Sequence, residues 1–126
     1  MIPRDQKYSK EHEWVRIEDD IAVVGITDYA QGELGDVVFV ELPRIGDKVS
    51  FMQPFGTIEA VKAVSDLYSP VTGEIVEANT ALESDAGIIN RDPYGEGWII
   101  KVKIEDESEL DELLDAAGYK ELIGQG

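Results

Sequence analysis

The 126-residue sequence contains no cysteine and a single histidine, His12. Without cysteine, the chain has no disulfide bond, no thiol nucleophile and no cysteine-ligated metal site. A single histidine also excludes multi-histidine zinc sites and most Ser-His-Asp triads, unless a partner chain completes them. The sequence therefore points away from the most common catalytic and metal centres.

Positive charge is also scarce. The chain has 11 Lys and Arg residues against 27 Asp and Glu residues, which gives a formal net charge of −16 at pH 7. Binding to nucleic acid or to an anionic membrane surface needs a basic patch. We therefore expect neither nucleic acid nor a membrane as a partner.

Long apolar runs are absent as well. No stretch approaches the roughly 20 apolar residues that a membrane-spanning helix needs. Residues 1–7 lack the apolar core of a signal peptide. These two features lead us to expect a cytoplasmic protein.

What remains is the composition of a globular domain, with 43% apolar and 30% charged residues. The length predicts a single domain over 1–126. Most of the chain consists of short β-branched segments separated by turns, which predicts a mainly β fold. The clearest predicted strands are 14–18, 21–26, 36–42, 74–78 and 98–104.

Two helices interrupt this pattern. Thr27 is a suitable N-cap for a short helix over 28–34. Near the C-terminus, Ser108 begins a predicted helix with an apolar face of helical period, and Gly118 ends it. Between them, residues 84–97 are predicted to form a long loop, and loops of that length are often functional.

Lys62 lies between two short predicted strands, 57–61 and 67–69. This arrangement predicts a hairpin with the lysine at or near its tip. The only turn-favouring pair nearby is Ser65-Asp66, just after the lysine. On spacing alone, a solvated turn lysine explains the pattern better than a functional one.

Conventional catalytic patterns are weak. The 27 carboxylates offer no spacing that singles out the pair a carboxylate-dependent hydrolase would need. His12 lies between Glu11 and Glu13, whose charges favour its protonated form. A lone histidine of this kind is typical of a surface or capping group. We therefore expect no catalytic residue and no metal ligand.

The context of Lys62 nevertheless resembles a known site. Glu59 three residues before the lysine, Gly46 sixteen before it and Gly73 eleven after it match the attachment site of lipoyl carrier domains. Further matching stretches are 12–15, 25–31, 34–43, 59–70 and 92–98. Together they cover nearly the whole chain, which resembles the glycine cleavage system H protein family.

The resemblance implies a lipoyl group joined to Lys62 by an amide bond, which would supply the sulfur that the chain lacks. It implies that lipoate ligase or lipoyl transferase recognises Glu59, Gly46 and Gly73. It also implies a lipoyl/biotinyl-carrier-like sandwich of two small sheets, with the lysine hairpin at one end, a short helix and a C-terminal helix. We expect such a carrier to be monomeric and non-catalytic.

The same resemblance implies three enzyme partners. Glycine decarboxylase loads the arm with an aminomethyl group, aminomethyltransferase passes the carbon to tetrahydrofolate, and dihydrolipoyl dehydrogenase reoxidises the dithiol. It further implies that the loaded arm is sheltered in a groove. We expect Glu13 and Asp66 to bind the ammonium of the loaded arm, and Trp14 to offer apolar surface.

Two alternative functions are compatible with this hairpin, and the sequence departs from the family pattern at two positions. A biotinyl carrier shares the hairpin fold, but biotin sites usually flank the lysine with methionines, where this chain has Val61 and Ala63. An H-like lipoyl relay or scaffold outside glycine cleavage would have the same hairpin. Gly32 lies inside the predicted short helix, and Met52 replaces a common turn glycine.

Overall fold

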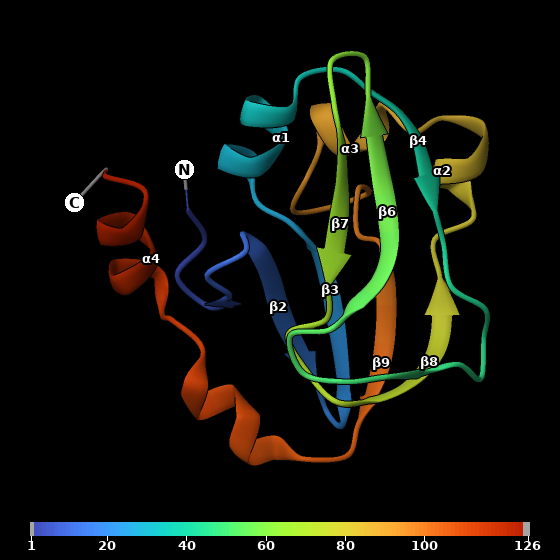
Figure 1. Cartoon of the computed structure of the whole chain (residues 1–126). Helices are drawn as coiled ribbons and strands as arrows, with labels where there is room; N and C mark the ends of the chain where they lie inside the picture. Colours follow the sequence, from blue (N-terminus) through green and yellow to red (C-terminus); the bar gives the residue numbers. More distant parts are fainter. Residues whose placement is uncertain (1, 125–126) are drawn as a thin grey trace.

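A computed structural model describes residues 2–124 of the chain. Two antiparallel sheets pack face to face, as Figure 1 shows. The larger sheet has the strand order β1-β2-β3-β9-β8-β5, and the smaller has the order β4-β6-β7. The predicted mainly β fold with two sheets is confirmed.

The larger sheet consists of β1 (Lys7–Tyr8), β2 (Glu13–Glu18), β3 (Ile21–Ile26), β5 (Lys48–Val49), β8 (Gly73–Ala78) and β9 (Ile100–Ile104). The smaller sheet consists of β4 (Val37–Glu41), β6 (Pro54–Ala60) and β7 (Val64–Tyr68). The helices are α1 (Asp28–Leu34), α2 (Ala81–Ser84), α3 (Ile88–Arg91), the 3₁₀ helix η1 (Glu107–Glu112) and α4 (Ala116–Leu122).

The main core lies between the sheets, because side chains alternate between the two faces of each strand. Its fully buried members include Val24, Ile75, Val102, Val40, Ile58 and Leu67. Burying one such side chain contributes about 1.5–3 kcal/mol, so this layer is the chief source of stability. A second cluster lies on the other face of β2 and β3, where Trp14 and Val23 pack with Tyr8 and Tyr119.

The C-terminal segment differs from its prediction. The chain forms η1, then an extended stretch, then α4, in place of one helix ending at Gly118. Leu114 exchanges two 2.8 Å backbone hydrogen bonds with Tyr8, which draws the chain out of helical geometry. Asp115 then caps α4 by accepting from the N–H of Gly118, at 2.8 Å. Gly118 therefore lies inside a helix rather than after one.

The predicted loop 84–97 is also more ordered than expected, because it contains α3. Asn90 of α3 binds the α1–β4 connection, donating from Nδ2 to the carbonyl of Gly35 at 2.9 Å. Farther along, the Trp14 indole N–H donates to the carbonyl of Pro93 at 2.9 Å. The loop is thus anchored both to α1 and to the larger sheet.

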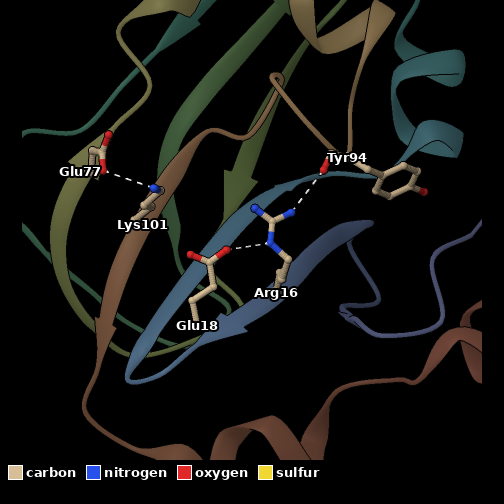
Figure 2. A network of polar contacts seen from close by, with 5 residues as sticks. All are labelled: Arg16, Glu18, Glu77, Tyr94 and Lys101. Atoms are coloured by element: carbon tan, nitrogen blue, oxygen red, sulfur yellow. Dashed lines mark hydrogen bonds and ion pairs between the residues drawn. The ribbon is translucent and has the colours of Figure 1, made fainter.

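A polar network extends this anchoring across the sheet (Figure 2). Arg16 of β2 pairs with Glu18 at 3.0 Å and donates to the carbonyl of Tyr94 at 3.4 Å. The hydroxyl of Tyr94 in turn accepts from the backbone N–H of Asp28, the first residue of α1, at 3.0 Å. The exposed ion pair itself adds little stability. The chain of contacts matters because it fixes the position of α1.

Candidate functional site

Lys62 lies at the tip of the β6–β7 hairpin, as predicted. The N–H of Ala60 donates to the carbonyl of Ala63 at 2.7 Å, which leaves Val61 and Lys62 as a two-residue loop. The predicted turn at Ser65-Asp66 is wrong, because both residues belong to β7 and pair with β6. Cross-strand pairing outweighs the local turn preference of this dipeptide.

The tip is tied to the neighbouring α1–β4 connection. The N–H of Val61 donates to the carbonyl of Asp36 at 3.0 Å. Beside it, the stem of Lys62 passes over Gly35, whose φ is 83°. Figure 1 shows the hairpin tip beside the end of α1. The backbone that carries the exposed lysine is therefore fixed by its contacts with the α1–β4 connection.

The three predicted recognition residues are not gathered in one place. Glu59 is exposed on β6, close to Lys62. Gly46 has a φ of 96° in the turn before β5. Gly73 begins β8, at the end of the sandwich opposite the hairpin tip (Figure 1). Since β5 pairs with this start of β8, the Gly46 turn lies at that end too.

The Thr72-Gly73 pair in the sequence predicts a turn in which the glycine has a positive φ, and this prediction is wrong. Gly73 is a strand residue without positive φ, and a Cβ there would lie 2.0 Å from the carbonyl oxygen of Lys103. Close approach of β9 is what requires glycine. By contrast, Met52, noted as a departure from a turn glycine, does have a left-handed backbone with a φ of 59°.

A groove of about 230 Å³ lies between α1, β7 and the segment that leads into β2. Its lining residues are Glu11, His12, Glu13, Ile26, Ala30, Glu33, Leu34, Ile58, Ser65, Asp66 and Leu67. The structure therefore brings Glu13 and Asp66 to one groove. It does not place Trp14 there, because that side chain faces the second cluster. The apolar wall consists instead of aliphatic residues that the sequence did not single out.

Glu13 has an unusual environment for a carboxyl group. It is only 2% exposed, and it accepts from the Ser9 hydroxyl at 2.5 Å and from the Tyr68 N–H at 3.3 Å. Burial raises the pKa of Glu13 to about 8, against the lowering effect of these two donors. A cation in the groove would favour the charged carboxylate. Asp66, in contrast, is exposed at the groove edge.

His12 is a groove residue whose role the sequence did not indicate. Its φ is 72°, and its Nδ1 lies 2.8 Å from the hydroxyl of Tyr119. As expected, the charge of Glu11 favours the protonated ring, but the sequence did not show that burial outweighs it. Burial is the largest effect and lowers the pKa of His12, although Glu11 and Glu33 act in the opposite direction.

Two kinds of feature are not found among residues 2–124. Among residues 2–124, no three or more acidic or histidine side chains are arranged to hold a metal ion. In the same part of the chain, no helix has the length and apolarity needed to cross a membrane. The main functional features are one presented lysine and the groove beside it. A two-sheet scaffold that presents one lysine beside a groove is the architecture of a carrier domain.

Comparison with known proteins identifies the family. Residues 6–126 match the family model described as Glycine cleavage H-protein. The chain is 56% identical over 125 residues to the glycine cleavage system H protein of Symbiobacterium thermophilum, covering 99% of this chain and 98% of that protein. It is 55% identical over 122 residues to that of Bacteroides fragilis, covering 97% of each.

A solved structure agrees. The crystal structure of a glycine cleavage system H protein from Mycobacterium marinum matches with a TM-score of 0.88 and 41% identity, covering 98% of this chain and 99% of that chain. The chain belongs to the glycine cleavage H-protein family. It is a carrier component of the glycine cleavage system.

Proposed function

We propose that this chain is a non-catalytic shuttle that carries a lipoyl group on Lys62. The observation that carries the proposal is the single exposed lysine on an anchored hairpin tip, next to a groove with an aliphatic wall and two carboxyl groups. When bound, the lipoyl group supplies the disulfide and dithiol chemistry for which this chain has no cysteine.

The residues present fit such an arm. Amide formation removes the positive charge of Lys62 and leaves a long, mostly apolar chain. Leu34 and Ala30 on α1 offer apolar surface to that arm within the groove, and the lysine stem packs against Gly35. The chain's own residues thus bind and orient the arm, and they exclude water from its end.

The partners we propose are glycine decarboxylase, aminomethyltransferase and dihydrolipoyl dehydrogenase. The carrier acts as a monomer in the cytoplasm, where these enzymes would meet it. Lipoate ligase or lipoyl transferase attaches the arm. Glu59 beside the lysine supports direct recognition, whereas Gly46 and Gly73 support the shape of the domain from its opposite end.

Sheltering of the loaded arm is part of this proposal. An aminomethyl group on sulfur carries an amine that is cationic near neutral pH, and water can release it as formaldehyde and ammonia. Glu13 and Asp66 line the same groove and hold the ammonium. A partly desolvated, charge-assisted contact is worth about 1.5–3 kcal/mol, which slows release of the arm by roughly ten- to a hundredfold.

The attachment site is tested with Lys62→Arg. Arginine keeps the charge but is too weakly nucleophilic to be acylated, so we expect no lipoylation and no glycine cleavage, with an unchanged melting temperature. Lys103→Arg, also at an exposed lysine, is the matched control and should be lipoylated normally. Intact mass separates lipoyl, biotinyl and unmodified protein. Lipoate found on any other lysine would refute the assignment.

Sheltering is tested by loading wild type and a Glu13→Gln, Asp66→Asn double variant, removing the partner enzymes and timing formaldehyde release. We expect faster release from the double variant. The control is Asp111→Asn with Glu121→Gln, which makes the same change of charge at exposed residues outside the groove. Equal rates in all three proteins would mean that these carboxyl groups do not hold the arm.

A further inference from the structure

A chain of hydrogen bonds joins α1, α4 and the groove. Thr27, the fully buried N-cap of α1, accepts from the N–H of Ala30 at 3.2 Å. The same Oγ1 lies 2.6 Å from the hydroxyl of Tyr119, which lies 2.8 Å from Nδ1 of His12. Tyr119 is itself fully buried and belongs to α4. The C-terminal helix therefore contacts the groove through one hydroxyl group.

The direction of these hydrogen bonds follows from counting the hydroxyl hydrogens and the acceptors open to them. A hydroxyl group has one hydrogen to donate. Within residues 2–124, the hydrogen-bond partners of the Thr27 hydroxyl are the N–H of Ala30, which can only donate, and the oxygen of Tyr119. Only one direction gives both buried hydroxyl hydrogens an acceptor among these groups: Thr27 donates to Tyr119, and Tyr119 donates to Nδ1 of His12. Nδ1 is then bare, and Nε2 carries the hydrogen of a neutral imidazole.

Protonation of His12 would break this arrangement. A hydrogen on Nδ1 would reverse the bond to Tyr119, and one of the two buried hydroxyl hydrogens, that of Thr27 or that of Tyr119, would be left without an acceptor. An unsatisfied buried donor is unfavourable, so this series of hydrogen bonds favours the neutral ring. Burial lowers the pKa of His12 in the same direction.

Other groups face the ring from each neighbouring element. Glu11 lies on its own segment, Tyr29 and Glu33 belong to α1, and Glu13 and Asp66 lie on the same groove. The two charges that act on the ring, on Glu11 and Glu33, favour protonation but do not outweigh burial. The hydrogen-bond chain adds to burial.

The backbone around His12 is fixed as well. Its N–H donates to the carbonyl of Ser9 at 3.1 Å, and its carbonyl accepts from the N–H of Thr27 at 3.0 Å. The ring of Tyr119 stacks on Tyr8 at 4.8 Å, which leaves its hydroxyl little freedom to move. Both ends of the Tyr119–His12 hydrogen bond are therefore held in place.

We propose that Tyr119 is a positioning residue, which holds His12 as the neutral Nε2–H tautomer and so keeps positive charge away from an ammonium bound in the groove. The consequence for the arm rests on the proposed function, because it requires a loaded arm in the groove. The tautomer of His12 does not depend on a loaded arm. The two parts are therefore tested separately.

The tautomer is tested by NMR on the unmodified protein, where the only histidine gives unambiguous ring signals. We expect ¹⁵N shifts of wild type to show a bare Nδ1. Tyr119→Phe should raise the pKa of His12 by about 0.5–1 unit, because the lost hydrogen bond stabilised the neutral ring. A hydrogen on Nδ1 in the neutral wild-type ring would overturn the proposal, whether or not the variant folds.

Tyr8→Phe is the matched control. It removes a hydroxyl from the same stacked pair, but the hydroxyl of Tyr8 donates to the carbonyl of Pro3 and does not contact His12. The pKa of His12 should stay at its wild-type value in this variant. An equal rise in both variants would show that loosened packing, and not the Tyr119 hydroxyl, changes the ring.

The consequence is tested on loaded protein by timing formaldehyde release at pH 6 and pH 8. The ratio of release rates, Tyr119→Phe over wild type, should exceed one at pH 6, where more of the variant carries an imidazolium that repels the ammonium, and should be close to one at pH 8. A ratio that does not change with pH would refute this role. If the Glu13→Gln, Asp66→Asn variant also releases at the wild-type rate, sheltering itself fails, whereas the tautomer result stands.

Discussion

The stem of Lys62 lies directly against Gly35, so that a Cβ built on the glycine would be 3.5 Å from Cε of the lysine. Gly35 ends α1 with a φ of 83° and a ψ of −158°, a region that is almost confined to glycine. The residue that ends the helix therefore also contacts the side-chain stem of Lys62. The end of α1 and the stem of the hairpin lysine thus meet at one position.

The backbone conformations of Gly35 and Gly32 predict opposite effects for their substitution by alanine. Gly35→Ala should lower the free energy of unfolding by about 1–3 kcal/mol, because alanine is strained in this region. Gly32→Ala, inside α1 with no atom within 4 Å of an added Cβ, should raise it by about 0.5–1 kcal/mol. Urea unfolding of both variants measures the difference. Equal effects would mean that the conformation of Gly35 is not a constraint.

The buried carboxyl group of Glu13 predicts a pH dependence of stability. Its pKa is raised from 4.5 to about 8 in the folded protein, so the folded state retains a proton that the unfolded state releases. Its contribution is complete below about pH 4.5 and is lost as pH rises towards 8. Between pH 6 and pH 8 the loss should be on the order of 2 kcal/mol.

Glu13→Gln tests this directly, because an amide of similar shape does not titrate. The melting temperature of wild type should fall more steeply between pH 6 and pH 8 than that of the variant. Glu112→Gln, at an exposed carboxyl group, should leave the slope unchanged. Parallel curves for wild type and Glu13→Gln would show that Glu13 is not protonated in the folded protein near pH 7.

Gly73 and Gly46 should respond differently to alanine. At Gly73 a Cβ would meet the carbonyl oxygen of Lys103 at 2.0 Å, which forces β8 and β9 apart, and we expect a loss of more than about 3 kcal/mol. At Gly46 nothing lies within 4 Å, so only the positive φ is strained, at about 1 kcal/mol. Thermal unfolding ranks the two. A larger loss at Gly46 would contradict the packing explanation.

Features with a local cause were predictable from the sequence. Thr27 and Gly35 mark the ends of α1, and the short apolar segments around Lys62 indicate a hairpin. The break before α4 was not predictable in this way, since it depends on hydrogen bonds between Leu114 and Tyr8, more than 100 residues apart. Periodicity alone favoured a continuous helix.

The groove also shows how far the sequence alone predicts the site. Glu13 and Asp66 were selected through a resemblance, and the structure places both on one groove. For His12, the charge of its sequence neighbour Glu11 favours the protonated ring, whereas burial in the folded protein outweighs it and lowers the pKa. Burial and Tyr119, which comes from the far end of the chain, set its environment. Properties that depend on desolvation and long-range hydrogen bonds require the folded structure.

Glu59 provides a test of enzyme recognition that is separate from folding. Its cross-strand neighbours Phe39 and Val64 are both exposed, at 50% and 65%, so the carboxylate lies between two apolar side chains on the outer face of the small sheet. Glu59→Gln should change the free energy of unfolding by no more than about 0.5 kcal/mol, as expected for a surface substitution. Its effect should appear in lipoylation.

If the lipoylating enzyme binds this carboxylate with a charged donor, losing the charge should slow lipoylation by about tenfold or more. Glu41→Gln is the control, because Glu41 is exposed on the adjacent strand β4, farther from the hairpin tip, and should be modified at the wild-type rate. Initial rates are followed by intact mass at limiting enzyme. Equal slowing in both variants would indicate attraction to the acidic surface in general, because Glu41 and Glu59 contribute the same charge to it. Unchanged lipoylation rates in both variants would show that the enzyme recognises the hairpin without binding the Glu59 carboxylate.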